Sequence, residues 1–133
     1  MTRLSILFLF LSLPCFAQKS TLGPCYDKAQ TQAALNVCAS EDAKRADVVL
    51  NNIYRKLLSQ VTDQPEAAAK IKMAEKAWIA YRDAYIDATY PAKDKQAEYG
   101  TMYPMEVDLL YATLTRRQVT ALKEMLQSYA SGK

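Results

Sequence analysis

The sequence predicts an all-α protein: a three-helix antiparallel bundle that runs up, down and up, with an N-terminal segment tied on by one disulfide. Three long stretches carry apolar residues at every third or fourth position, which is the spacing of an amphipathic helix. The few glycines and prolines fall between these stretches rather than inside them. No stretch alternates apolar and polar residues as a strand does. Because each helix must bury its apolar face, the three are expected to share one core.

The boundaries of the helices follow from capping residues and prolines. The first helix is expected over residues 31–61, with a break near Ser40 as an alternative, because a serine followed by acids can cap a new helix. The second begins at Pro65, since proline at the first helical position followed by Glu66 is a typical start, and it runs to about Tyr90. Residues 91–103 lose the periodicity and are expected to form a loop, after which Pro104 opens the third helix.

Each predicted helix has one face that should point into the core. In the second helix the segment AWIAYRDAYI, residues 77–86, is expected to place Trp78, Tyr81 and Tyr85 on the core side, with Arg82 at its margin. The full predicted face of this helix is Ile71, Ala74, Trp78, Tyr81, Tyr85 and Ala88. The first helix offers Leu35, Cys38, Ala39, Ala46, Val49, Leu50, Ile53, Tyr54, Leu57, Leu58 and Val61. The third offers Met105, Leu109, Ala112, Arg116, Val119, Leu122, Leu126 and Tyr129.

Residues 1–17 have the pattern of a secretory signal peptide. A short basic start is followed by an apolar run over residues 4–13 and by small residues up to Ala17. That run is too short to cross about 30 Å of hydrocarbon comfortably, so a retained membrane helix is disfavoured. Lipidation at Cys15 is also disfavoured, because Pro14 stands where a small residue is needed. The mature chain is therefore expected to be one domain, residues 18–133, which is periplasmic or secreted and does not contact the membrane.

The charges exclude one class of partner and the cysteines suggest one bond. The formal charge is +3, and it falls to +2 without residues 1–17, which hold one arginine and no acid. Since basic and acidic residues are interspersed along the chain, no nucleic-acid footprint is expected.

The mature chain keeps Cys25 and Cys38, which in an oxidising compartment are expected to form a disulfide. A metal pair or a redox pair is the alternative, but the further ligands and the C-x-x-C spacing are missing.

The sequence offers little for catalysis. It contains no histidine, which removes the commonest general base and metal ligand. No phosphate-binding loop, nucleophile elbow or calcium loop is present. A glycosidase that works with two carboxylates alone is the remaining alternative, yet a small bundle leaves little room for its cleft. We therefore expect no catalytic residues, no metal, no cofactor and no enzymatic activity.

Two arginines fall in or near the predicted apolar faces and need partners. Arg116 lies on the face of the third helix, and Arg82 lies one turn after Trp78. An inward arginine requires a carboxylate or carbonyl oxygens, because an unpaired buried charge is strongly destabilising. We expect a network between helices that contains Arg82, Asp83 and Arg116, joined by Asp47 or by a tyrosine hydroxyl. The alternative is a surface arginine that binds a carboxylate of a partner protein.

An ordered set of short motifs spans residues 25–122. The set comprises Cys25, Thr31-Gln32, Asn36, Cys38, Ala46-Asp47, Leu50-Asn51, Tyr54, Ala77-Trp78, Tyr81-Arg82-Asp83, Pro104-Met105, Leu114-Thr115 and Arg117. In this order and at these spacings the chain resembles the LprI-like lysozyme-inhibitor domain family, whose members are secreted or periplasmic helical domains. The resemblance implies a protein partner, namely a lysozyme that the protein inhibits. It also marks structural motif positions: Asp47, Asn51, Tyr54, Trp78, Tyr81, Arg82, Asp83 and Arg117. Arg116 joins this set because of its place on the apolar face of the third helix.

The chain departs from the family pattern at two places. A second cysteine pair of the family is replaced by Ile86 and Leu110, and a Gly-Gly-Ser-like turn by Tyr99-Gly100-Thr101.

We expect the loop around this turn to be the surface that contacts a partner protein, because tyrosines favour binding hot spots. Its candidate contact residues are Tyr90, Tyr99, Gly100, Thr101 and Tyr103. A structural role, in which the tyrosines cover the open end of the bundle, is the alternative. An immunity-type or accessory protein that binds another cell-wall toxin or partner would share all these features. The sequence does not specify the oligomeric state.

Overall fold

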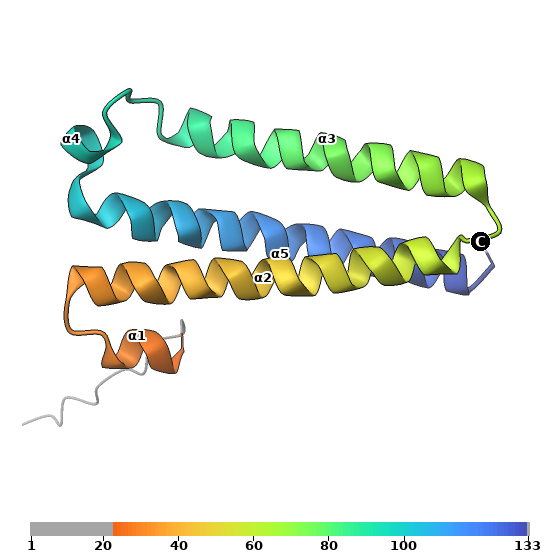
Figure 1. The fold of residues 1–133 in the computed structure, drawn as a ribbon, viewed down its shortest axis with the longest axis horizontal. Helices are drawn as coiled ribbons and strands as arrows, with labels where there is room; N and C mark the ends of the chain where they lie inside the picture. The colour runs from red at the N-terminus through yellow and green to blue at the C-terminus, as the bar shows by residue number, and fades with distance from the viewer. Residues whose placement is uncertain (1–22, 133) are drawn as a thin grey trace, which may run out of the picture.

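The computed structural model describes residues 23–132, and every regular element in that range is helical (Figure 1). Three long α-helices account for most of it: α2 (Gln32–Gln60), α3 (Pro65–Thr89) and α5 (Tyr103–Ala130). The short elements are α1 (Pro24–Lys28), α4 (Lys95–Tyr99) and a 3₁₀ turn, η1 (Gly100–Met102). The predicted all-α class is confirmed, whereas the predicted signal peptide lies outside the described residues.

The three long helices lie side by side along the molecule and alternate in direction (Figure 1). The short helix α1 lies against the first half of α2, and α4 with η1 forms the turn between α3 and α5 at one end. The sequence predicts a loop over residues 91–103. This prediction is wrong for the part of the range that forms α4 and η1. Asp94 caps α4 by accepting a hydrogen bond from the Ala97 N–H at 2.9 Å. A helix of five residues is too short to show a periodicity in the sequence.

The ends of the long helices follow the local signals in the sequence. The Thr31 hydroxyl accepts a hydrogen bond from the Ala34 N–H at 3.1 Å and caps α2. Pro65 occupies the first turn of α3, where its missing N–H has no cost. The alternative of a break near Ser40 is wrong, since α2 runs without interruption through that position.

The core lies mainly between α2 and α5, which pack most closely of all the helices. Near the middle of these helices the buried residues are small, namely Ala43, Ala46 and Ala112, so the two backbones approach each other. Toward the α2–α3 turn the core contains larger side chains, with Leu50, Leu57, Val61, Ile71, Val119 and Leu122 in one buried cluster. The apolar faces predicted for the first and third helices largely match this core, except that Val49 is 44% exposed and Arg116 is exposed as well.

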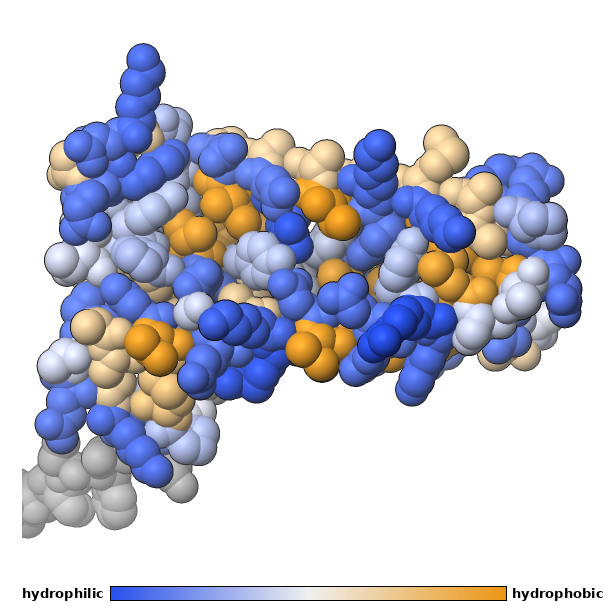
Figure 2. All heavy atoms as spheres, viewed as in Figure 1, coloured by the Kyte–Doolittle hydropathy of each residue, from blue (hydrophilic) through white to orange (hydrophobic). Residues whose placement is uncertain are grey.

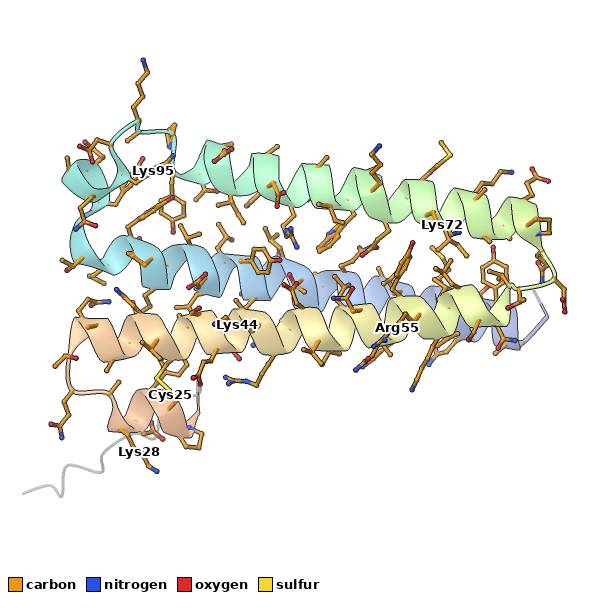
Figure 3. All side chains as sticks on the ribbon, in the orientation of Figure 1. Cys25, Lys28, Lys44, Arg55, Lys72 and Lys95 are labelled. Carbon is orange, nitrogen blue, oxygen red and sulfur yellow. A yellow bond between two sulfur atoms is a disulfide. The ribbon has the colours of Figure 1, made fainter. Side chains whose placement is uncertain are left out.

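Helix α3 packs less closely than the other two, and its buried face differs from the prediction. Its buried residues are Ile71, Glu75 and Arg82, whereas Tyr81 and Tyr85 are 56% and 43% exposed. The prediction that these two tyrosines, Ala74 and Ala88 face the core is therefore wrong. Figure 2 shows polar atoms among the apolar ones between α3 and α2. In Figure 3 side chains from all three helices occupy this space, so α3 turns long polar side chains inward instead of its tyrosines.

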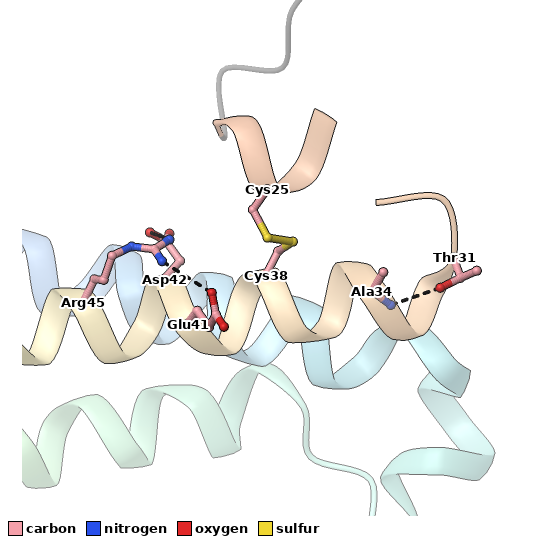
Figure 4. The surroundings of a disulfide bond; sticks show 7 residues. All are labelled: Cys25, Thr31, Ala34, Cys38, Glu41, Asp42 and Arg45. Atoms are coloured by element: carbon pink, nitrogen blue, oxygen red, sulfur yellow. Dashed lines mark hydrogen bonds and ion pairs between the residues drawn. A yellow bond between two sulfur atoms is a disulfide. The ribbon is translucent and has the colours of Figure 1, made fainter. Parts of the chain in front are cut away.

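The predicted disulfide between Cys25 and Cys38 is present and ties α1 to α2 (Figure 4). The two Cα atoms lie 5.7 Å apart, within the usual range for such a bond. Tyr26, Cys38 and Ala39 form a small buried cluster beneath it. The bond thus holds an element of only five residues, which could not bury enough surface to dock alone. Among residues 23–132, no helix is long and apolar enough to span a bilayer.

Candidate functional site

The Arg82 guanidinium lies at the centre of a polar layer between α3 and the α2–α5 pair. Its side chain is only 10% exposed. The guanidinium donates to Asp83 Oδ1 from Nε at 3.0 Å and lies 2.9 Å from the same oxygen through Nη2. Its Cζ atom also lies over two aromatic rings, at 5.0 Å from the Trp78 centroid and 4.1 Å from that of Tyr111. Arg82 is thus held by an ion pair and by two cation–π contacts.

The Tyr111 hydroxyl connects this arginine to α2. It accepts a hydrogen bond from Arg82 Nη1 at 2.8 Å and donates to the Asp47 carboxylate at 2.8 and 3.0 Å. Burial, followed by the hydrogen bond to Asp47, raises the pKa of Tyr111 to about 12. The Arg82 guanidinium lies 4.0 Å from Asp47 itself. One residue from each long helix therefore meets at this point, and together they fix the helices relative to one another. We call Asp47, Trp78, Arg82, Asp83 and Tyr111 the polar layer.

A cleft of about 420 Å³ opens beside the polar layer, between α2 and α3. Its walls include five of the predicted motif residues: Asp47, Asn51, Tyr54, Trp78 and Arg82. Glu75 lies in the same cleft, only 7% exposed, and accepts a hydrogen bond from Gln118 Nε2 at 2.8 Å. Burial, together with the nearby Glu75 charge, raises the pKa of Tyr54. The carboxylates of Asp47 and Glu75 both accept hydrogen bonds from α5, an arrangement that suits holding helices together.

The arginine network differs from the expected one at Arg116. Its side chain is 51% exposed and pairs with Asp42 of α2 instead of joining Arg82 and Asp83. Burial would raise the pKa of the Asp42 carboxyl, but its hydrogen bonds from Arg116 and Arg45 outweigh burial and lower that pKa. Buried Thr115 takes the inward position that Arg116 was expected to fill. The predicted membership of Arg116 in the inner network is therefore wrong, while Arg82, Asp83, Asp47 and a tyrosine hydroxyl do form it.

Two further motif residues lie on the surface. Tyr81 is exposed and packs against Tyr85 of the same helix, with their ring centroids 5.8 Å apart. Arg117 is exposed on α5. The motif positions therefore divide into those that build the polar layer and the cleft and those that face solvent.

The tyrosines of the predicted partner-binding loop form a cluster at the α4 end. Tyr90 meets Tyr99 and Tyr103 edge to face, with centroid distances of 5.3 Å in both cases. Tyr99 and Tyr103 stack on each other at 5.6 Å. All three are half-buried. Because their rings contact one another, they support the turn between α3 and α5 from within.

Hydrogen bonds hold the rest of this turn to the beginning of α2. Asn36 Nδ2 donates to the Thr101 carbonyl at 3.2 Å, and Gln32 Nε2 donates to Asn36 Oδ1 at 2.8 Å. Gly100 adopts φ 67°, a backbone conformation that favours glycine over other residues. Beside it, Met102 is 47% exposed. The turn is thus held in place by α2 and by the tyrosine cluster, and it exposes side chains such as Met102 to solvent.

Sequence reasoning missed three residues that matter here. Tyr111 is the hub of the polar layer, Glu75 lies in the buried face of α3, and Asp42 is the partner of Arg116. A signal in the sequence could have revealed Glu75, because Ile71, Glu75, Trp78 and Arg82 follow helical spacing and so share one face of α3. Within residues 23–132 no group of three potential metal ligands lies close together.

Comparison with known proteins places this architecture in a family. The chain matches the family model described as lysozyme inhibitor LprI over residues 25–122. It is also 35% identical, over 133 aligned residues, to an uncharacterised protein of Rhizobium meliloti (strain 1021), a similarity that covers 90% of this chain and 93% of that relative. No solved structure matches the chain. Because the matched region includes both cysteines, the polar layer and the tyrosine cluster, the chain belongs to the LprI lysozyme-inhibitor family.

Proposed function

We propose that the mature protein is an exported inhibitor that binds a peptidoglycan-cleaving lysozyme and blocks its cleft. The observation that carries this proposal is membership of the LprI lysozyme-inhibitor family over residues 25–122. The carboxylates that line the cleft already accept hydrogen bonds from neighbouring helices, which favours binding over catalysis as the role of the fold. The signal-like residues 1–17 support export to the compartment where lysozymes act.

The end formed by α4 and η1 is the surface we assign to the lysozyme contact. It lies at one end of an elongated molecule, beyond the end of α3 and level with the beginning of α2 (Figure 1). Pro91, Glu98, Thr101 and Met102 are exposed there. The tyrosine cluster and the Asn36 side chain hold the turn in one conformation before binding. A turn that is ordered in advance loses little conformational entropy on binding, which favours affinity.

This proposal gives the loop residues two different roles. Tyr90, Tyr99 and Tyr103 support the turn, because their rings are half-buried against one another. Gly100 allows the backbone to turn, while Thr101 and Met102 contact the lysozyme. Met102 is the strongest single contact candidate, since it is a large apolar side chain left 47% exposed at the tip of the turn.

The test is inhibition of peptidoglycan hydrolysis by residues 18–133, measured with lysozymes of several structural classes. We expect the protein to slow at least one of them at micromolar concentration. Met102→Glu should weaken this inhibition by about tenfold or more, because it places a charge in the contact. Val48→Glu is the matched control, since Val48 is 60% exposed in the middle of α2, and it should inhibit normally.

Two results would contradict the proposal. A folded protein that slows none of the lysozymes would remove the function itself. Equal inhibition by Met102→Glu and the unchanged protein would remove the α4 end as the contact surface. Mass spectrometry of the exported protein should give a chain that begins at Gln18, and retention of residues 1–17 would count against the export step.

A further inference from the structure

The outer face of α3 is apolar and has no partner among the described residues. It consists of Ala69, Met73, Ala77, Ala80, Ala84 and Ala88, which we call the outer strip. All six side chains are exposed, and Met73 is 71% exposed. At 3.6 residues per turn they fall within an arc of about 100° on the side away from Ile71 and Arg82. Glu66, Lys70 and Asp87 fall in the same arc near the two ends of the strip, where Lys70 pairs with Glu66 at 2.9 Å, so the arc is free of charge only from Met73 to Ala84. Figure 2 shows pale apolar atoms along the upper edge of the molecule, where α3 lies.

The exposed faces of the other two long helices are different. That of α2 carries Glu41, Lys44, Arg45, Arg55 and Lys56 together with three exposed valines, Val37, Val48 and Val49, and that of α5 carries Arg116, Arg117, Lys123 and Glu124. Such charges are what a solvated helix face normally presents. The contrast within one molecule indicates that the outer strip contacts another surface, since contiguous exposed apolar area usually marks an interaction site.

Charged residues along one flank of the outer strip identify the partner. Lys72 and Lys76 lie in the N-terminal half of this flank, and Asp83 and Asp87 lie in its C-terminal half. Both pairs have a spacing of four residues, so each pair lines up along the same side of the helix. The flank is therefore positive at one end and negative at the other. A second α3 that runs in the opposite direction would present the complementary order of charges.

We propose that two copies of this protein associate through their outer strips, with the two α3 helices antiparallel about a two-fold axis. The strip is symmetric about the point between Ala77 and Ala80, so Met73 lies level with Ala84 of the second copy. Along the flank, Lys72 then lies within two residues, about 3 Å of helix rise, of the level of Asp87 of the second copy, and Lys76 lies equally near Asp83, which also keeps its ion pair with Arg82 of its own chain. Each contact occurs twice, as an isologous interface requires. Alanine along the strip lets the two backbones approach closely.

The size of this interface sets the strength expected of the dimer. A contact made by one helix of 25 residues from each copy falls near the lower end of stable interfaces, about 1,200 Å² in total. We therefore expect reversible dimerisation at micromolar protein concentration. The outer strip lies on the side of α3 opposite the polar layer, and the α4 end lies beyond the end of the helix. The dimer does not depend on the proposed lysozyme contact.

The test is the concentration dependence of the mass of residues 18–133, measured by sedimentation velocity from about 10 to 200 µM. The mass should rise toward twice that of one chain as the concentration increases. Ala80→Arg, at the centre of the outer strip, should keep the protein monomeric throughout. Ala121→Arg is the matched control, because Ala121 is exposed on α5, and it should dimerise normally. Circular dichroism on each variant establishes that the helices are intact.

A charge swap tests the antiparallel direction. Lys72→Asp should weaken dimerisation by about tenfold, because it places an acid beside Asp87 of the second copy. The double variant Lys72→Asp, Asp87→Lys restores opposite charges and should dimerise normally. A monomer at every concentration would overturn the proposal, as would equal dimerisation of Ala80→Arg and the unchanged protein. Failure of the double variant to recover would overturn the antiparallel pairing.

Discussion

Tyr111 joins α5 to both other long helices through a single oxygen atom. Its hydroxyl accepts from Arg82 and donates to Asp47, so a change to phenylalanine removes both bonds and leaves the ring that stacks on Arg82. We expect Tyr111→Phe to lower the free energy of unfolding by about 1 to 3 kcal/mol, because Asp47 loses a donor. Urea unfolding followed by circular dichroism measures this loss. An unchanged midpoint would show that the polar layer contributes nothing net to stability.

The raised pKa of Tyr111 gives the protein an alkaline sensitivity of known sign. The folded pKa is about 12, above the ordinary value of 10.0, so the folded state holds this proton more tightly than the unfolded state does. The associated stability is fully present below pH 10 and is lost as the pH rises toward 12. We expect the unchanged protein to lose more stability than Tyr111→Phe over this interval. Thermal unfolding of both proteins from pH 9 to 12 gives the comparison, and parallel curves would contradict it.

Sequence reasoning identified part of this layer and missed its hub for a physical reason. Arg82, Asp83 and Asp47 are charged, and charges near an apolar face call for partners that can be searched for in the sequence. Tyr111 could not be distinguished from the eight other tyrosines, because its place depends on how far α3 lies from α5. The pairing of Arg116 with Asp42 was missed for a similar reason. At the edge of a helix face, a long side chain can turn to solvent and bind a neighbour there.

At the scale of elements, α3 is the long helix with the fewest buried apolar residues. It contributes Ile71 as its one buried apolar residue among those described, and its other inward residues are polar. Helices with few buried apolar contacts open at lower free energy than the rest of a protein. We expect the backbone amides of α3 to exchange hydrogen for deuterium faster than those in the middle of α2 and α5. Exchange followed by mass spectrometry or NMR measures this, and equal protection of the three helices would contradict it.

The disulfide is expected to act on α1 alone. Removal of Cys25–Cys38 frees a closed loop with a sequence separation of 13 residues, which costs about 3 kcal/mol in the chain-entropy model. Cys25→Ser with Cys38→Ser should therefore lower the stability by an amount of that order, while α2, α3 and α5 keep their helicity. Thermal unfolding of the double variant, compared with the reduced unchanged protein, checks this. A loss of most helical signal would mean that α1 organises the whole fold.

The positions of the long helices could be predicted from the sequence far better than their rotation. Caps and prolines are local signals, and the predicted limits of α2 and α3 and the predicted start of α5 agree with the structure to within about one or two residues. The rotation of α3 about its axis depends on which of its side chains fit into the space beside α2 and α5. The spacing of apolar residues along α3 predicts that Tyr81 and Tyr85 face the core. In the structure, the space beside α2 and α5 is filled by Glu75, Trp78 and Arg82 instead.

At the scale of the whole molecule, three surfaces are separated in space. The polar layer lies between the helices with its cleft opening between α2 and α3, the α4 end lies at one end of the molecule, and the outer strip lies on the far side of α3, although Lys72 and Lys76 of its charged flank also line the cleft. This separation makes the two proposals independent, because Met102 and Ala80 can be changed without altering the polar layer. We expect Ala80→Arg, which should be monomeric, to inhibit lysozyme as well as the unchanged protein does. Loss of inhibition by this variant would place the outer strip in the lysozyme contact.

The close packing of α2 against α5 has a consequence for how the protein folds. These helices are the first and last long elements of the chain, and the residues that join them, such as Asp47 and Tyr111, are 64 positions apart. The best-packed part of the core therefore forms only after the chain has closed a long loop, which slows folding compared with a bundle of local hairpins. Stopped-flow measurements should show that Leu57→Ala slows folding, whereas Ile71→Ala mainly speeds unfolding. Helix α3 would then pack late in folding, against a nucleus that α2 and α5 have already formed.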